Sequence, residues 1–398
     1  MDTKAIKELN NLYIMNTYGD RQLAIVRGDG TKVWDADGNE YLDFFSGIAV
    51  ISLGHCHPEV VAAVKSQAER LFHVSNLYYI EPQVKLAQKL AANSFADKWF
   101  FCNSGAEANE AAIKIARKYW FNKGEARPGI IAMDGSFHGR TLMTITATGQ
   151  AKYKKGFAPL MPGFKHVPFN DVDAVAGAID ETTGAVLVEP IQGESGVRVP
   201  SDDYLAKLRE LCDDKGLLLI FDEVQTGLGR TGSLFCYEHS GIAPDIITLA
   251  KSLAGGVPIG AMGATDEVAA AFQPGDHAST FGGNPIATSA ACAVMDVLTK
   301  PGFIDGVAQT GDYLFSEVRA ALDGDNHVVE IRGKGMMMGV ELSVPAKEVV
   351  GRLLAGGIIA GTAGEKVLRF LPPLIITEAE VDTVVAALRD AMKELPDG

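Results

Sequence analysis

The feature that most constrains the fold of this chain is an alternation of short apolar runs with longer amphipathic segments, which begins at about residue 57. We interpret the apolar runs as buried strands at residues 99–102, 130–133, 185–188, 217–221 and 246–249. The amphipathic stretches between them, such as residues 106–120 and 204–213, have helical spacing. Strands that alternate with helices predict βαβ units and a mostly parallel sheet covered on both faces.

The segments on either side of this pattern differ from it. Residues 21–53 indicate a small β-meander, with hairpin turns at Asp29-Gly30 and Asp37-Gly38. Residues from about 300 onward predict an α+β region, which ends in a helix with a capping box at Thr377 and Glu380. The apolar stripe expected on that last helix consists of Val381, Val384, Val385, Leu388 and Met392.

A helix is also expected directly after residue 57. Apolar residues at helical spacing predict it, namely Val60, Val61, Val64, Ala68, Leu71 and Phe72. From these patterns we predict that residues 1–56 contribute to a small domain, residues 57–285 form a large domain, and residues 286–398 complete the small one.

Charge and cysteine usage argue against several classes of protein. A net charge of −14 gives no basic footprint for nucleic acid, so any anionic substrate must be met by local Arg or Lys. The five cysteines are scattered without a CxxC pair, as expected for small, buried, reduced side chains. No apolar stretch reaches membrane-spanning length and the N-terminus lacks an apolar signal region, so we expect a cytoplasmic protein with no membrane partner.

Two charged residues stand where predicted strands end. Asp222 follows residues 217–221, and Lys251 follows residues 246–249 within a Gly-rich stretch. Open α/β sheets bind ligands at the carboxyl ends of their strands, so both side chains suit one cofactor between them. A lysine amine forms a Schiff base with an aldehyde, and an acid keeps a ring nitrogen protonated. Taken alone, each residue is more simply explained as a turn cap or a surface charge.

The segment after the predicted strand 99–102 is a candidate phosphate site. Ser104, Gly105 and Ala106 are small residues that expose backbone N–H groups where the next helix begins. A helix N-terminus favours an anion, so these positions suit a phosphate. The alternative is an ordinary helix cap.

Another loop follows the predicted strand 130–133. Phe137 offers a ring that can stack on a planar cofactor, and Arg140 offers two parallel hydrogen bonds to a carboxylate. A core phenylalanine and a surface arginine are the alternatives. We expect His138 to be packed or to lie at a cofactor edge, and we expect no metal site.

Together these segments resemble the class III (ornithine-type) aminotransferases of fold type I over nearly the whole chain. The matching stretches are residues 54–58, 73–76, 103–110, 135–140, 188–193, 222–232, 249–261, 279–285 and 368–377. The resemblance implies an aspartate aminotransferase-like α/β fold, with a large, mostly parallel seven-stranded sheet domain and a small α+β domain. It also implies pyridoxal 5'-phosphate as cofactor and a homodimer with active sites at the interface.

The resemblance also implies individual roles. Lys251 would carry the cofactor as a Schiff base, and Asp222 would partner the ring nitrogen. The other residues expected at the cofactor are Ser104, Gly105, Ala106, Phe137, Glu223, Val224, Gln225 and Thr280, the last reaching the phosphate of the neighbouring subunit. Those expected at the substrate are Arg140, Glu194, Ser279 and Arg369. Glu194 and Arg369 would act as a switch, in which the glutamate covers the arginine for one substrate and releases it for the other.

The implied reaction moves the terminal amino group of N2-acetylornithine to 2-oxoglutarate, giving N-acetylglutamate 5-semialdehyde and glutamate in arginine biosynthesis. Succinylornithine, succinyldiaminopimelate, ornithine and 4-aminobutyrate are alternative donors. Residues 17–24 and Ser195 depart from the family's pattern, and the first of these could change the pocket wall.

The alternative functions are an aminomutase, which needs no 2-oxoglutarate, and a binding protein without cofactor. A dinucleotide oxidoreductase is poorly supported, because no GxGxxG motif follows a strand at a helix start.

Overall fold

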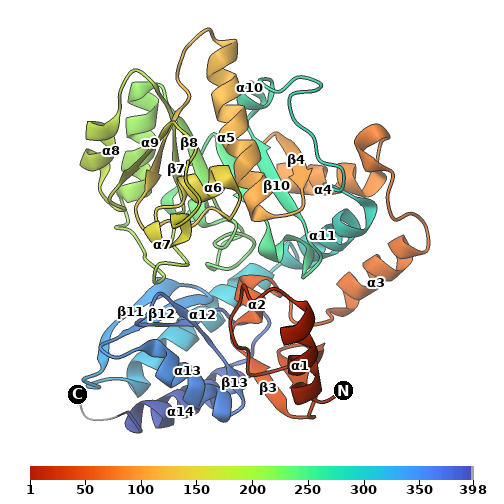
Figure 1. The fold of residues 1–398 in the computed structure, drawn as a ribbon, viewed down its shortest axis with the longest axis vertical. Helices are drawn as coiled ribbons and strands as arrows, with labels where there is room; N and C mark the ends of the chain where they lie inside the picture. The colour runs from red at the N-terminus through yellow and green to blue at the C-terminus, as the bar shows by residue number, and fades with distance from the viewer. Residues whose placement is uncertain (396–398) are drawn as a thin grey trace.

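The upper lobe in Figure 1, which runs from α3 to α11 along the chain, is built on a seven-stranded sheet. The computed structural model describes residues 1–395, and its upper sheet has the strand order β4-β10-β9-β8-β7-β5-β6. The bounds are Lys98–Cys102 (β4), Gly129–Met133 (β5), Phe164–Val167 (β6), Thr183–Val188 (β7), Leu218–Asp222 (β8), Ile246–Leu249 (β9) and Gly260–Ala264 (β10). Only β10 runs antiparallel to its neighbours, which confirms the mostly parallel sheet.

All five apolar runs are strands of this sheet, and two further strands, β6 and β10, were not predicted. Apart from Met262, strand β10 consists of Gly and Ala, and the neighbouring chain lies close to its two glycines. A Cβ atom at Gly260 would lie 2.2 Å from the Ser104 carbonyl oxygen, and one at Gly263 would lie 2.7 Å from the Trp99 ring. Side chains are therefore excluded at these two positions, and the strand lacks a continuous run of large apolar residues although it is fully buried.

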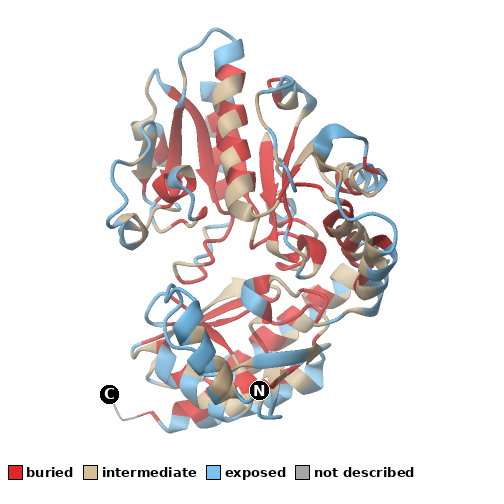
Figure 2. Ribbon diagram, turned by 45° about the vertical axis from the view of Figure 1, so that its right-hand side comes forward, coloured by how far each residue is buried: buried red, intermediate tan, exposed pale blue. Residues whose placement is uncertain are grey.

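Helices cover both faces of the upper sheet. Figure 2 shows the strands buried, while α5 (Gly105–Asn122) alternates between buried and partly buried residues until its exposed last two positions. Helix α5 packs on β9 and β10, whereas α11 (Pro285–Leu298) packs on α3 (Pro58–Ala68) and α4 (Glu81–Ala92). The remaining helical segments of this lobe are η1 (Ser75–Leu77), α6 (Leu142–Ala147), α7 (Ala151–Lys154), α8 (Val172–Ala178), α9 (Tyr204–Lys215), η2 (Cys236–Ser240), η3 (Lys251–Ala254) and α10 (Asp266–Ala269).

The helix predicted after residue 57 is shorter than its apolar spacing suggested. Helix α3 ends at Ala68, and Leu71 and Phe72 lie beyond it with exposed fractions of 42% and 65%. The last two positions of the predicted stripe therefore belong to an exposed loop, so the expected length was wrong.

The lower lobe, comprising α1 to α2 and α12 to α14, contains two four-stranded sheets in the orders β1-β2-β3-β13 and β11-β12-β15-β14. Its strands are Ile25–Asp29 (β1), Lys32–Asp35 (β2), Glu40–Asp43 (β3), Val328–Lys334 (β11), Met337–Leu342 (β12), Ile358–Ile359 (β13), Gly361–Ala363 (β14) and Val367–Phe370 (β15). Its helices are Thr3–Tyr13 (α1), Ser46–Ala49 (α2), Phe303–Ala321 (α12), Ala346–Ala355 (α13) and Glu378–Lys393 (α14).

The antiparallel meander predicted near the N-terminus is present, and its last strand, β3, pairs in parallel with β13 from the C-terminal part of the chain. The capping box at Thr377 is also present at the start of α14. On that helix Val381, Val384, Leu388 and Met392 are buried, while Val385 is partly buried against the core.

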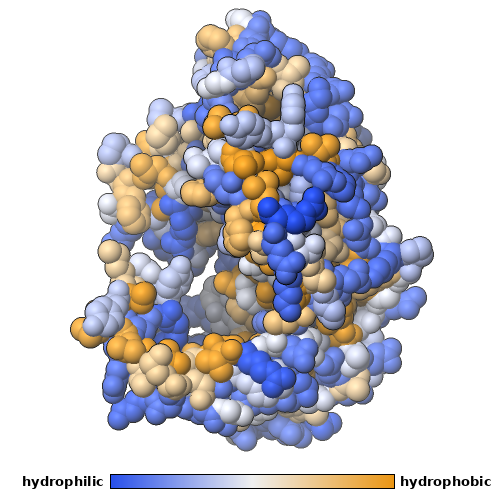
Figure 3. All heavy atoms as spheres, turned by 90° about the vertical axis from the view of Figure 1, so that its right-hand side faces the viewer, coloured by the Kyte–Doolittle hydropathy of each residue, from blue (hydrophilic) through white to orange (hydrophobic). Residues whose placement is uncertain are grey.

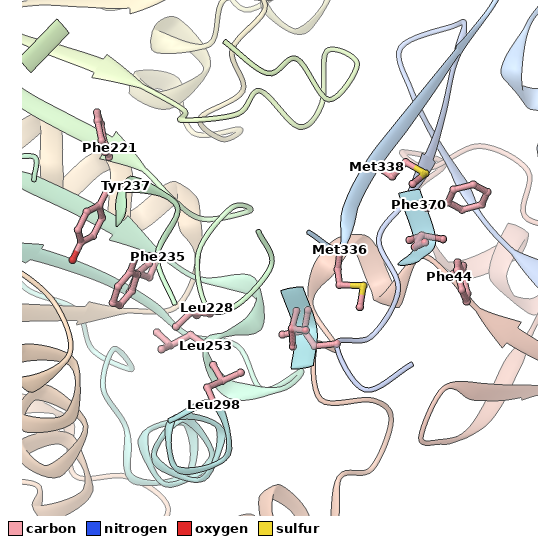
Figure 4. Packing of buried hydrophobic residues seen from close by; sticks show 14 of the residues in the cluster. Phe44, Phe221, Leu228, Phe235, Tyr237, Leu253, Leu298, Met336, Met338 and Phe370 are labelled. Carbon is pink, nitrogen blue, oxygen red and sulfur yellow. The ribbon is translucent and has the colours of Figure 1, made fainter. Parts of the chain in front are cut away.

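One apolar cluster joins the two lobes. Figure 4 shows Phe221 and Leu253 from the upper lobe and Met336, Phe370 and Phe44 from the lower lobe, all members of this cluster. Because the lobes share their packing, the end of the upper sheet is held firmly against the lower one. The boundaries at residues 56 and 285 stay a prediction.

Two further sequence expectations can be compared with the described residues. All five cysteines are free, and Cys102, Cys212 and Cys236 are buried as expected. Cys292 is only half-buried and Cys56 is exposed, so the expectation of burial does not hold for these two. Within residues 1–395, no helix is both long enough and apolar enough to span a membrane.

Candidate active site

A cavity of about 460 Å³ lies where strands β4, β5, β7, β8 and β9 end. Ten of the predicted site residues line it: Ser104, Gly105, Ala106, Phe137, Arg140, Glu194, Asp222, Val224, Gln225 and Lys251. These residues come from separate loops, which the parallel strands bring to one edge of the sheet.

Lys251 is separated from the end of β9 by Ala250 alone and opens the short helix η3. Its backbone has a φ of +40°, a sparsely populated conformation for a residue with a side chain. Burial lowers the pKa of its amine, and the carboxylates of Glu194 and Asp222 only partly offset this effect. A lowered pKa increases the share of neutral amine, which is the form that attacks an aldehyde.

Asp222 ends β8 and is buried beside the cavity. Its Oδ2 accepts a hydrogen bond of 2.7 Å from Asn109 Nδ2 and lies 2.8 Å from His138 Nδ1. Its Oδ1 accepts a hydrogen bond of 3.1 Å from the Val224 backbone N–H. His138 is buried, as expected for a packed residue, whereas Asn109 was not predicted to belong to the site.

The N-terminus of α5 forms a small cup on the cavity wall. Ser104 caps the helix, because its Oγ accepts a hydrogen bond of 3.2 Å from the Glu107 backbone N–H. Gly105 follows, and a Cβ atom there would lie 2.8 Å from the Val224 side chain. The cup therefore has room for an anion near the backbone N–H groups of the first turn, but no room for a larger residue at position 105.

Glu189, which sequence reasoning missed, joins two loops of the cavity. Its Oε1 accepts a hydrogen bond of 2.7 Å from the Phe137 backbone N–H, and its Oε2 accepts a weaker one of 3.4 Å from Gly193. Burial, together with the neighbouring negative charge of Asp222, raises the pKa of the Glu189 carboxyl well above its usual range. This carboxyl fixes the backbone of Phe137, whose ring borders the cavity.

Glu194 and Arg369 form an ion pair beside Gln225. Arg369 Nη1 lies 2.8 Å from Glu194 Oε1 and 3.3 Å from Gln225 Oε1, and it also donates a 3.0 Å hydrogen bond to the Gly193 carbonyl oxygen. Burial raises the pKa of Glu194, but the positive charges of Arg369 and Lys251 and the hydrogen bonds outweigh it, so the pKa falls to about 2. Glu194 is therefore an anion at neutral pH, and it lines the cavity while Arg369 does not.

Arg140 lies exposed at the cavity rim. Its guanidinium carbon is 4.0 Å from the centre of the Tyr153 ring and 5.6 Å from that of Phe137. No carboxylate of residues 1–395 lies within ion-pair distance of it. Its charge is therefore available to an incoming carboxylate.

Three predicted residues besides Arg369 lie outside the cavity. The Glu223 carboxylate accepts hydrogen bonds of 2.7 Å and 2.8 Å from the backbone N–H groups of Cys236 and Tyr237, so its side chain supports the fold behind the site. Ser279 is half-buried, and its Oγ accepts a 3.2 Å hydrogen bond from Asn103 Nδ2 near the α5 cup. Thr280 is exposed.

Comparisons with known proteins all find aminotransferases. The model of the aminotransferase class-III family matches residues 13–392. The chain is 53% identical to an acetylornithine aminotransferase of Caldanaerobacter subterraneus subsp. tengcongensis, over 96% of this chain and 98% of that protein. It is 49% identical to an acetylornithine aminotransferase of Methanocaldococcus jannaschii, over 98% of each.

A solved structure extends the likeness to three dimensions. The ornithine aminotransferase of Toxoplasma gondii crystallised with oxidised glutathione has a TM-score of 0.94 and 36% identity, over 98% of this chain and 94% of that one. Its active site holds PLP at partial occupancy.

Proposed function

The chain belongs to the class-III aminotransferases, and on that premise we propose that it transfers the terminal amino group of N2-acetylornithine to 2-oxoglutarate. The products are N-acetylglutamate 5-semialdehyde and glutamate, which places the reaction in arginine biosynthesis. The enzyme is a transaminase that uses pyridoxal 5'-phosphate. The observation that carries the proposal is that Lys251 and Asp222 line one cavity together with the anion cup of α5.

The residues of the cavity fit this cofactor. Ser104, Gly105 and Ala106 would hold its phosphate, and a cup without space for a Cβ at position 105 suits a group that lies against the backbone. Asp222 would face the ring nitrogen, and Lys251 would hold the aldehyde end. When bound, pyridoxal phosphate supplies an aldehyde that condenses with amines and a protonated ring that withdraws electrons.

Gln225 and Phe137 would complete the cofactor site. Gln225 would donate a hydrogen bond to the ring's phenolic oxygen, and it already donates one of 3.1 Å to Glu194. The Phe137 ring would stack on the cofactor ring, with its backbone held by Glu189. Both roles are supported by the place of these side chains on the cavity wall.

The chain's own groups would then handle the proton and the carboxylates. The Lys251 amine, whose pKa burial lowers, would move a proton away from the carbon that bears the donor's amine. Arg140 would bind the α-carboxylate of the donor through two parallel hydrogen bonds. Glu194 would cover Arg369 while the donor is bound and expose it for the second carboxylate of 2-oxoglutarate.

A homodimer with active sites at the interface is part of the proposal. Thr280, proposed to reach the phosphate of the neighbouring subunit, is exposed in the single chain. Five large side chains near the loop between α3 and α4 are also exposed: Leu71, Phe72, Leu77, Tyr78 and Tyr79. Figure 3 shows apolar side chains gathered in patches on the face turned toward the right of Figure 1, the side on which α3 lies. Exposed apolar patches of this kind mark interaction surfaces. Sedimentation velocity would test for the dimer. A single monomeric species would contradict this part of the proposal.

A panel of amine donors tests the proposed substrate. With 2-oxoglutarate as acceptor, we expect N2-acetylornithine to give the highest kcat/KM among N2-acetylornithine, succinylornithine, succinyldiaminopimelate, ornithine and 4-aminobutyrate. Acetyl and succinyl donors differ only at the end remote from the reacting amine, so succinylornithine should come second. A preference for ornithine or 4-aminobutyrate, or product formation without 2-oxoglutarate, would contradict the proposal.

We expect Gly105→Ala to weaken cofactor binding. The new Cβ would lie 2.8 Å from Val224, so the α5 cup must shift from the position that fits a phosphate. A loss of about tenfold in affinity for pyridoxal phosphate, roughly 1.4 kcal/mol, is expected when the apoprotein is titrated with the cofactor. The matched control is Gly177→Ala, because a Cβ at that helical glycine meets nothing within 4 Å. Equal affinities of the two variants would argue against the cup.

We expect Arg140→Ala to raise the KM of both substrates by about 10- to 100-fold, because hydrogen bonds between charged groups contribute about 1.5–3 kcal/mol. The affinity for pyridoxal phosphate should stay unchanged, since Arg140 binds the substrate and not the cofactor. Lys152→Ala serves as control, because Lys152 Nζ lies 4.7 Å from the same Tyr153 ring. Saturation curves of Arg140→Ala that match those of the control would refute the role.

A further inference from the structure

Behind Asp222 lies a short relay of buried polar groups. Thr248 Oγ1 donates a hydrogen bond of 2.8 Å to Asn109 Oδ1. Asn109 Nδ2 donates one of 2.7 Å to Asp222 Oδ2 and another of 2.9 Å to the His138 carbonyl oxygen. All four residues are buried, and they come from β9, α5, β8 and the loop after β5. Thr248 lies directly beside Asp222, since the two are paired in the register of β8 and β9.

The relay has only one workable orientation of the Asn109 side chain. Asp222 Oδ2 and the His138 carbonyl oxygen both accept hydrogen bonds, so the Asn109 amide nitrogen has to face them. The Asn109 oxygen then faces Thr248, whose hydroxyl supplies the donor. With the amide turned over, its oxygen would face two acceptors and a buried donor would be lost. The two acceptors therefore set which end of Asn109 meets Asp222, and the Thr248 hydroxyl holds the amide in that orientation by satisfying its oxygen.

Thr248 has no other evident reason to be polar. It stands in the strand Ile246–Leu249, whose other members are aliphatic and all buried. It does not line the cavity, but its hydroxyl bonds to Asn109, which does. A buried hydroxyl in an apolar strand must have a partner, and Asn109 is that partner.

We propose that Asn109 and Thr248 are positioning residues, which hold the Asp222 carboxylate ionised and oriented toward the cofactor ring. This proposal rests on the proposed function, in which the ring nitrogen of the cofactor is the partner of Asp222. The amide of Asn109 donates a hydrogen bond to Oδ2, which favours the ionised form of the carboxylate. Oδ1 accepts the Val224 backbone N–H, and its remaining lone pair would face the ring. The other charged or titratable groups near Asp222 are His138, Glu189 and Lys251. Glu194 lies further along the cavity, and Arg369, which does not line the cavity, is paired with it.

The test compares Thr248→Val with Thr248→Ser in the holoenzyme. Valine keeps the shape of the side chain but removes the hydroxyl donor, whereas serine keeps the donor. The readout is the pH midpoint of the bound cofactor's visible absorbance, which depends on how strongly the ring withdraws electrons. In Thr248→Val we expect the midpoint to rise by about half a unit to one unit, because a less stabilised Asp222 anion leaves the ring nitrogen less charged. We expect kcat to fall about tenfold with KM unchanged, and Thr248→Ser to behave as the native enzyme.

Three outcomes distinguish the relay from the proposed function. A Thr248→Val midpoint equal to that of Thr248→Ser and the native enzyme would overturn the relay. A midpoint raised in both variants would also overturn it, since the hydroxyl would then not be the cause. If instead Lys251→Ala keeps turnover and cofactor absorbance, the proposed function itself fails. Asn109→Ser carries the same expected rise and replaces Thr248→Val if that variant does not fold.

Discussion

Replacing Lys251 with alanine should abolish turnover, by about 10⁴-fold or more, because we propose that the same amine holds the cofactor and moves the proton. The variant should still bind pyridoxal phosphate through the α5 cup and Asp222, so cofactor content should fall far less than activity. The visible absorbance of the bound cofactor should change, because no amine of the protein remains to condense with its aldehyde.

Lys154→Ala is the matched control for this prediction. Burial lowers the pKa of Lys154 as it does that of Lys251, but Lys154 does not line the cavity. Borohydride reduction followed by mass spectrometry gives a readout that does not depend on activity. The native enzyme and Lys154→Ala should both carry the reduced cofactor on Lys251, and Lys251→Ala should carry none. Turnover in Lys251→Ala, or a reduced cofactor found on another lysine, would refute the assignment.

The strands that the sequence predicts are those in which the apolar pattern results from burial on both faces. Strands β8 and β9 are fully buried, and their aliphatic residues made them visible as short apolar runs. Strand β10 is equally buried, but the Ser104 carbonyl and the Trp99 ring leave no room for a side chain at Gly260 and Gly263, so its apolar run is interrupted. Strand β6 lies at the edge of the sheet and includes exposed Lys165, so its run is interrupted.

Some residues of the candidate site could likewise be predicted from the sequence, and others could not. Asp222 and Lys251 could be predicted because each follows a strand whose end lies at the ligand edge of the sheet. Asn109 stands in the second turn of α5, where helical spacing predicts that a residue is inward but not which partner it meets. Glu189 follows β7, so the same rule that found Asp222 would have found it.

Some positions depend on contacts that no local pattern encodes. Glu223 follows the same strand as Asp222, yet alternation along the chain turns its carboxylate toward η2 instead of the cavity. Thr280 needs a neighbouring subunit before any role in the site can be seen. Leu71 and Phe72 show the reverse problem, because helical spacing alone cannot tell a buried stripe from an exposed apolar loop.

Replacing Arg369 with alanine should separate the two half-reactions. We expect the step with 2-oxoglutarate to slow by about 10²-fold, because a hydrogen-bonded charge pair with its second carboxylate is lost. The step with the acetylated donor should change by less than about threefold, since in the proposed switch Glu194 covers Arg369 while that donor is bound. Stopped-flow absorbance of the bound cofactor measures each half-reaction separately. Equal losses in the two steps would refute the switch.

The ion pair also predicts how the stability of this variant depends on pH. The folded pKa of Glu194 is about 2, below its ordinary value of 4.5, so its contribution to the free energy of unfolding is fully present above about pH 4.5. That contribution is lost as the pH falls toward 2. The destabilisation caused by Arg369→Ala should therefore be largest near neutral pH and shrink in acid, as urea unfolding would show.

Glu194→Gln provides the counterpart, because it removes the charge that covers Arg369 but keeps the shape of the side chain. With Arg369 no longer neutralised, dicarboxylates should bind more tightly, and the acetylated donor should bind less well beside an uncovered positive charge. The two variants should thus shift substrate preference in opposite directions, as the direct 2.8 Å contact between the side chains requires. If both variants instead lose activity equally toward both substrates, the pair holds the cavity wall in shape and does not select between carboxylates.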